Sequence, residues 1–223
     1  MSRSAGDGRP GLDVDRIVTA ALRVADRGDL EALSMRRLAD ELGVTPMAIY
    51  KHIDNRERLL DAMVDHVVAE IASASTVGEW KHDLRARILA ARSATRRHPW
   101  MQSAIESRTA ASPAVLAHMD ALMATMFDGG LSSDLVHHAM HALSTRMWGF
   151  TRDVLPTPTA PADPAERARA YAAFAEHYPS IVRMATTAPG AGESCDTDAE
   201  FLFALDLLLD GVERLHANGW SSR

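Results

Sequence analysis

Apolar side chains recur every three or four residues along most of the chain, the spacing that places them on one face of an α-helix. The first such stretch carries Ile17, Ala21 and Val24, and the last runs from Asp198 to Ala217. No segment shows the alternation of apolar and polar residues, rich in β-branched side chains, that indicates a strand. The sequence therefore predicts an all-α protein of about nine or ten helices.

Glycine, proline and short polar segments divide this pattern. Residues 155–165 hold four prolines, which exclude a helix and predict a loop, and a second loop is expected at 186–197. Residues 73–78 are expected to form a hinge, and residues 1–11 a disordered tail. We expect helices over 13–28, 35–42, 46–52, 55–71, 79–97, 100–107, 113–128, 133–154, 166–184 with an interruption near Pro179, and 198–217.

The stretch 33–58 predicts two short helices joined by a tight turn. Ser34 is a good N-cap for the first helix, and Gly43 suits the left-handed conformation that often follows a helix. Thr45 and Pro46 then start the second helix, because proline has no N–H to lose at the first helical position. A helix of about two turns is unstable alone in water. Its outer face must therefore contact something else while neighbours hold its inner face.

Such a pair is typical of a helix-turn-helix, whose second helix enters the major groove of DNA. Met47 and Ala48 suit contact with a thymine methyl, and Arg36 suits a bidentate contact with guanine. An ordinary helical corner with solvated charges remains the alternative. The candidate DNA contacts are Ser34, Met35, Arg36, Thr45, Pro46, Met47, Ala48, Tyr50, Lys51, His52 and Arg56, with Tyr50, Lys51, His52 and Arg56 expected at phosphates.

Residues 12–72 resemble the DNA-binding domain of the tetracycline-repressor (TetR) family of transcriptional regulators. Tyr50-x-His52 and the spacing from Asn55 to Leu59-Leu60 carry the resemblance, which continues weakly through Glu79-Trp80. It implies a homodimeric, ligand-responsive repressor that binds palindromic double-stranded operator DNA and is released by a small hydrophobic or amphipathic effector. The DNA-binding domain would span 12–72, and a ligand-binding and dimerisation domain 73–223.

Composition sets limits on this picture. The net charge of −6 over 223 residues is unusual for a DNA-binding protein, but Arg36, Arg37, Lys51, Arg56 and Arg58 cluster in the helix-turn-helix stretch. No apolar run is long enough to span a membrane, and the N-terminus lacks the apolar core of a signal peptide. A single cysteine excludes an intrachain disulfide and suits the reducing cytoplasm, where we expect the protein to act.

Three histidines, His137, His138 and His141, are the main candidates for other chemistry. His137 and His141 share one helix face, as in some metal sites, but no third ligand is indicated. They are either structural histidines, pocket contacts or metal ligands, in decreasing order of preference. The family's tetracycline-binding members hold a magnesium–drug chelate at positions that match Ile71, Ile105 and Arg108, and none of these is a suitable ligand here. No metal and no cofactor are therefore expected.

Methionine and aromatic residues gather on the middle helices. They form either a plain core or an adaptable cavity, since thioethers fit varied ligands. The candidate ligand contacts are Trp100, Met101, Ile105, Met119, Met123, Phe127, His141, Met147 and Trp148. Family dimers pair two terminal helices with their copies, so the candidate dimer contacts are Leu143, Phe201, Leu205, Leu208, Leu209 and Val212.

Three functions compete on this sequence. The favoured one is a dimeric DNA-binding repressor whose ligand changes the spacing of two reading heads. The second is an all-α protein that binds small molecules and has no role on DNA. The third is a small helical enzyme that uses the His137/His141 face; no phosphate-binding loop or nucleophile motif supports it, and no enzyme is expected.

Overall fold

The structure is a computed structural model that describes residues 11–28, 30–71, 77–108, 110–150, 161–187 and 196–223. Every regular element within these ranges is helical, which confirms the all-α class. The α-helices number eleven, and none of those described is long and apolar enough to cross a membrane. The interruption predicted near Pro179 within the segment 166–184 is confirmed, because one helix ends at Ala175 and the next begins at Pro179.

In chain order the helices are α1 (Val14–Arg27), α2 (Met35–Leu42), α3 (Pro46–Tyr50), α4 (Arg56–Ile71), α5 (Trp80–Arg97), α6 (Met101–Glu106), α7 (Pro113–Asp128), α8 (Ser133–Leu143), the 3-10 helix η1 (Ser144–Trp148), α9 (Pro164–Ala175), α10 (Pro179–Thr187) and α11 (Thr197–Ala217). Most of the predicted tail, most of the predicted hinge at 73–78, and residues 155–160 and 188–195 of the two predicted loops lie outside the described residues. The described ends of these loops are partly helical: α9 begins at Pro164, where proline suits the first helical position, and α10 extends to Thr187.

The chain falls into two compact units, residues 1–150 with 208–223, and residues 151–207. The boundary predicted at residue 73 stays a prediction; α4, which ends at Ile71, packs on helices from both predicted domains. The second unit holds α9, α10 and the first half of α11. Its helices α9 and α10 pack on each other.

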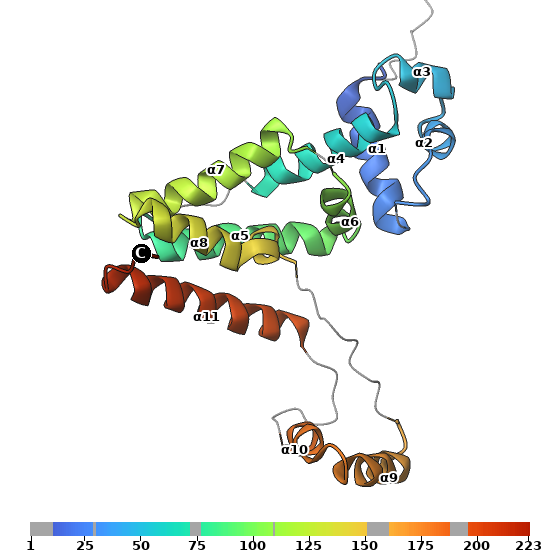
Figure 1. Cartoon of the computed structure of the whole chain (residues 1–223). Coiled ribbons are helices and arrows are strands. Elements are labelled where there is room, and N and C mark those ends of the chain that lie inside the picture. Colours follow the sequence, from blue (N-terminus) through green and yellow to red (C-terminus); the bar gives the residue numbers. More distant parts are fainter. Residues whose placement is uncertain (1–10, 29, 72–76, 109, 151–160, 188–195) are drawn as a thin grey trace, which may run out of the picture. The chain divides into compact units, whose positions relative to one another are not determined.

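Helices α1–α3 form a small head at one end of the first unit (Figure 1). The Asp13 carboxylate caps α1 by accepting from the backbone N–H of Arg16 at 2.8 Å, and the Ser34 hydroxyl caps α2 by accepting from Arg37 N–H at 3.2 Å. Gly43 takes the predicted left-handed conformation with φ of 65°. These local signals placed both helix starts and the turn correctly.

Helix α3 departs from the prediction in two ways. It ends at Tyr50 instead of His52, and the Thr45 hydroxyl makes no capping hydrogen bond. Proline at the first position sets the helical φ without a side-chain cap, so Thr45 is not needed as one. Ile49 and Ile53 are buried as expected and hold this short helix on the head.

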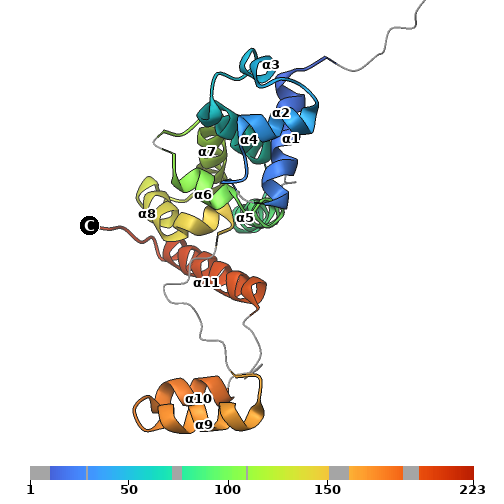
Figure 2. The same cartoon turned by 90° about the vertical axis from the view of Figure 1, so that its right-hand side faces the viewer.

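Helix α4 links the head to the middle helices. It buries Leu59, Met63 and Val67 among other apolar residues, and it packs on α1 as well as on α5, α6 and α7. Figure 2 shows α4 beside α1 and α2 above the level of α5 and α8. An apolar face this wide is buried because two sets of helices cover it.

Helix α8 is shorter than the predicted segment 133–154. It ends at Leu143, the 3-10 helix continues to Trp148, and Gly149 then adopts φ of 76°. A Cβ atom at Gly149 would lie 2.3 Å from the Cα atom of Arg92, so only glycine fits where this turn crosses α5. The Arg92 guanidinium donates to the Gly149 carbonyl oxygen at 2.9 Å, which fixes the crossing.

Candidate functional site

The outer face of α3 carries exposed side chains of mixed character. Met47 is 68% exposed and Tyr50 41%, and Lys51 and His52 follow as exposed residues. Ile49, on the other face of the same helix, is fully buried. Arg36 is also exposed, on α2, while Met35 and Ala48 are half-buried. The Ser34 hydroxyl caps α2, and Thr45 and Pro46 are exposed at the start of α3.

Arg56, a predicted phosphate contact, makes hydrogen bonds within the protein. Its guanidinium donates to the backbone carbonyl oxygens of Leu30 at 2.6 Å and Leu33 at 3.3 Å. These carbonyls belong to the connection between α1 and α2, so Arg56 ties the start of α4 to the head. Arg56 therefore has a structural role that the sequence did not indicate, and its contact with a phosphate stays a prediction.

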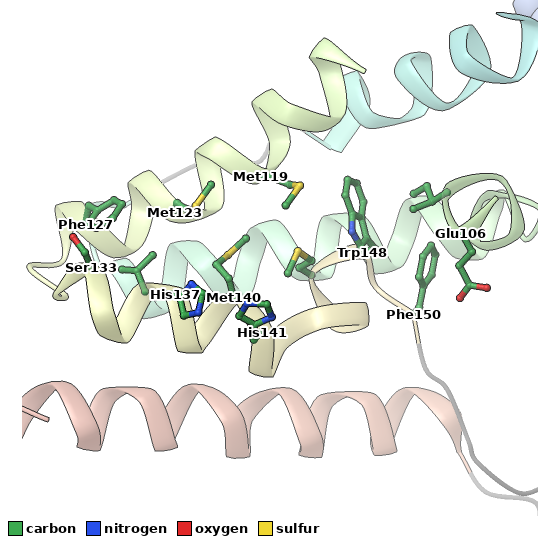
Figure 3. A pocket seen from close by; sticks show the side chains of 13 residues that line it. Glu106, Met119, Met123, Phe127, Ser133, His137, Met140, His141, Trp148 and Phe150 are labelled. Carbon is green, nitrogen blue, oxygen red and sulfur yellow. The ribbon is translucent and has the colours of Figure 1, made fainter. Parts of the chain in front are cut away.

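A cavity of about 540 Å³ opens between α7 and α8 (Figure 3). Its lining is mostly apolar and rich in sulfur, with Met119 and Met123 on one side and Met140 on the other. The lining residues are Ile105, Glu106, Met119, Met123, Phe127, Ser133, Val136, His137, Met140, His141, Met147, Trp148 and Phe150. Seven of the nine candidate ligand contacts are therefore in the lining: Ile105, Met119, Met123, Phe127, His141, Met147 and Trp148.

Trp100 and Met101 are not in this lining, so the cavity lends their predicted role as ligand contacts no support. Both are buried, Met101 in the core and Trp100 with its indole N–H donating to Asp26 of α1 at 2.8 Å. The candidate ligand contacts also left out Glu106, Ser133, Val136, His137, Met140 and Phe150, although a pocket role for His137 was one of the alternatives that the sequence left open. Helical spacing could have indicated some of these residues, because Val136, His137 and Met140 share one face of α8 with the predicted contact His141.

The three histidines form a chain of ring contacts, in which the rings of His137 and His138 meet edge to face at 5.2 Å. The rings of His137 and His141 meet edge to face at 4.7 Å and both line the cavity. His138 contacts Trp220 at 5.3 Å, and its Nε2 lies 3.6 Å from a carboxylate oxygen of Asp134. Among the described residues, no group of three or more His, Cys, Asp or Glu side chains is placed to hold a metal ion.

A fourth histidine, His118 of α7, lies directly behind the cavity wall and was not singled out from the sequence. It is 5% exposed, its ring lies 4.8 Å from that of Trp148, and its Nε2 is 3.4 Å from the Met147 carbonyl oxygen. Burial lowers the pKa of His118, because the charged imidazolium is disfavoured away from water. His118 therefore packs against Trp148 as a neutral imidazole.

The predicted dimer contacts mostly face the interior of the single chain. Leu205 and Leu209 are fully buried, Phe201 and Leu143 are 1% exposed, and Val212 is buried as well. Only Leu208 of the predicted set is half-buried. The large exposed apolar side chains of α11 are Phe203 at 68% and Leu207 at 62%. Sequence periodicity found the apolar residues of α11 but could not tell a face covered by the chain itself from one left open.

Two family models match the chain. "Bacterial regulatory proteins, tetR family" matches residues 17–63, and "Tetracyclin repressor-like, C-terminal domain" matches residues 74–216. The first covers the head with the start of α4, and the second covers the cavity and most of α11.

Individual relatives agree with these models. The chain is 30% identical to the HTH-type transcriptional repressor DrrR1 of Streptomyces coeruleorubidus over 94% of its own length and 80% of that protein. A possible TetR family regulator from Streptomyces coelicolor A3(2) has a similar structure, with a TM-score of 0.71 and 29% identity over 91% of this chain and all of the other. ActR of Streptomyces coelicolor in complex with actinorhodin matches with a TM-score of 0.68 and 25% identity, over 92% of this chain and 98% of ActR. Neither the enzyme nor the DNA-independent binding protein is favoured by these matches.

Proposed function

Because the chain belongs to the tetR family of bacterial regulatory proteins, we propose that α3 reads operator DNA and that the cavity between α7 and α8 takes the effector. The chain is a ligand-responsive, DNA-binding transcriptional repressor. The proposal rests on the packing of α4, which contacts both the head and the helices around the cavity. A ligand that binds one arrangement of these helices better than another shifts the repressor toward that arrangement.

The assignment of α3 to the major groove rests on its exposed surface. Met47 and the half-buried Ala48 lie near its N-terminal end, where small or apolar groups contact thymine methyls. Lys51 and His52, just beyond the helix, and Tyr50 suit phosphate oxygens on either side of the groove. Arg36 of α2 is the candidate for a specific guanine contact.

Two reading heads are needed for a palindromic operator, whose half-sites lie about one helical turn apart. We therefore propose a homodimer in which the open side of α11, with Phe203 and Leu207, meets a second copy. These residues are four positions apart and so share one helix face. They replace the buried Leu205 and Leu209 as the candidate contacts.

The lining of the cavity favours a small hydrophobic or amphipathic effector with a few polar groups. Methionine and aromatic side chains give close, adaptable contact with an apolar body. His137, His141 and Glu106 add hydrogen-bonding groups that orient it. Actinorhodin, which ActR binds, is one compound to test, at 25% identity between the two chains.

The first experiment selects operator DNA in vitro with the purified protein from a random duplex pool, followed by gel shift with the selected site. A palindromic site bound by the wild type and released when a ligand occupies the cavity supports the proposal. Native mass spectrometry of the purified protein identifies a co-purified ligand for the release step. Failure to enrich any sequence would remove the DNA-reading role from α3.

A further inference from the structure

Two methionine side chains are open to water in the described part of the chain. The sequence holds eleven methionines, and all except Met1 are described. Four of these are buried and four are half-buried, including those that line the cavity. The remaining two are Met47, 68% exposed on α3, and Met184, 65% exposed on α10. An oxidant dissolved in water therefore reaches these two side chains first.

Met47 contributes little to the core of the head. Figures 1 and 2 both show α3 on the side of the head away from α5 and α6. The neighbours that hold this short helix do so through Ile49, which is fully buried, and through Ile53, which is 5% exposed. A chemical change at Met47 should therefore leave the head folded and alter only what the outer face of α3 can bind.

Oxidation changes the character of that outer face. When a peroxide oxidises the Met47 thioether, the O–O bond breaks, an S–O bond forms and water or an alcohol leaves, while sulfur gives up two electrons. The product, a sulfoxide, is polar and accepts hydrogen bonds, whereas the thioether is apolar. A thymine methyl offers the new oxygen no hydrogen-bond donor, and burying a polar group without a partner is unfavourable.

The groups assigned to phosphates do not take part in this reaction. Lys51 keeps its charge and Tyr50 its hydroxyl, and both are exposed beside Met47. Contacts with phosphates set affinity for any DNA, and contacts with base edges set the preference for one sequence. A sulfoxide at Met47 should therefore lower affinity for the operator more than affinity for random DNA.

We propose that Met47 is a site of reversible oxidation, at which a peroxide abolishes the base contact of α3. Methionine sulfoxide reductases reverse the reaction, because two thiols give up their hydrogens to the sulfoxide oxygen and leave as a disulfide and water. This role rests on the proposed function of α3, and it gives the repressor a second input that needs no ligand in the cavity.

The test oxidises the full-length protein in a Cys195→Ser background, which removes the only thiol of the chain. Hydrogen peroxide is the oxidant, since it spares the amine of Lys51 and the phenol of Tyr50. Peptide mass spectrometry measures the sulfoxide fraction at each methionine. Fluorescence anisotropy measures affinity for the operator from the in vitro selection and for random duplex DNA, before oxidation, after it, and after both sulfoxide reductases with dithiothreitol have acted.

Three substitutions separate Met47 from the other methionines. Met47→Leu keeps an apolar side chain of similar volume that peroxide does not oxidise. Met184→Leu is the matched control, because Met184 is almost equally exposed but belongs to the other compact unit. Met47→Gln imitates the polarity of the sulfoxide without oxidant. Each variant is compared with its own oxidised form, so a change in starting affinity does not enter the result, and thermal melts compare folding.

In the parent and in Met184→Leu, oxidation should lower operator affinity at least about fivefold, with a much smaller effect on random DNA. The reductases should restore the parent. Oxidised Met47→Leu should bind the operator as it did before oxidation, and Met47→Gln should bind it weakly from the start. Operator DNA added before the peroxide should slow sulfoxide formation at Met47 and not at Met184.

Equal losses in the parent and in Met47→Leu would overturn the role of Met47, because another methionine would then be responsible. Full operator affinity in a parent oxidised at Met47 would overturn it as well. Both results leave DNA reading by α3 in place. A reduced parent that binds no operator would instead overturn DNA reading by α3, and the oxidation site with it.

Discussion

His118 shows how burial of one residue ties folding to pH. Its pKa lies below the ordinary value of about 6.5 because burial disfavours the imidazolium, so the unfolded chain takes up a proton first as the pH falls. Stability should therefore fall as the pH drops below about 6.5, down to the folded-state pKa. Melting temperatures at pH 8 and pH 5 should differ less for His118→Asn than for the wild type. Parallel curves for both proteins would exclude His118 as the group responsible.

Lys51 is predicted to act on DNA through its charge alone. Lys51→Ala should weaken binding to selected and random DNA alike, and it should lower the slope of log K against log salt by about one. A salt titration of both complexes measures this slope. An unchanged slope would remove Lys51 from the phosphate contacts.

Arg36→Ala should behave differently, because a guanidinium that reads a base is sensitive to sequence. The expected cost is about 1–3 kcal/mol at one base pair, with relaxed preference there. Affinities of the wild type and of Arg36→Ala for operators with single base-pair substitutions show at which position the preference is lost. A uniform loss at every position would assign Arg36 to the backbone.

Residue type alone does not reveal a partner that lies far along the chain. Arg56 and Trp100 have the side chains of a phosphate contact and a ligand contact, yet both make hydrogen bonds that hold the head. Leu30 and Leu33 lie 26 and 23 residues from Arg56, and Asp26 lies 74 residues from Trp100, and no spacing rule predicts such pairs. Lys51 and Met47 could be placed because an outward helix face follows from local periodicity.

At the scale of elements, the sequence predicts what local chemistry determines. The start of α2 follows from the Ser34 cap and its end from Gly43, both readable within ten residues. The end of α8 could not be read in this way. It depends on Gly149 meeting the backbone of Arg92, which belongs to another helix.

Gly149→Ala tests that crossing. The new methyl would meet the Arg92 backbone, and overpacking costs about 1–3 kcal/mol in addition to about 1–2 kcal/mol for the left-handed backbone. Gly219→Ala is the matched control, because φ there is 61° and no atom lies within 4 Å of the added Cβ. Urea unfolding should show a clearly larger loss for Gly149→Ala. Equal losses would mean that backbone conformation, and not the contact with α5, requires glycine at 149.

At the scale of the whole molecule, periodicity identified the helices around the cavity but not its boundary. Met119, Met123 and Met147 were assigned to a cavity because thioethers and aromatic rings gather on these helices. Which faces stay uncovered depends on how α6, α7 and α8 pack, and this placed Glu106 and Phe150 in the lining and Trp100 outside it. For the same reason, periodicity could not show which face of α11 stays uncovered and is free to contact a second copy.

Helix α11 has one buried face and one exposed face, and substitutions on the two faces should affect dimer formation and folding differently. Leu207 is 62% exposed, so Leu207→Glu should leave the fold intact and place a charge in the proposed dimer contact. Leu205 is fully buried, so Leu205→Glu should unfold the chain by burying an unpaired charge. Sedimentation and thermal melts separate these outcomes: a folded monomer for the first variant and a destabilised protein for the second. Operator affinity should fall for the folded monomer, because a single head reads only one half-site. A folded dimer of unchanged size for Leu207→Glu would place the interface on another surface.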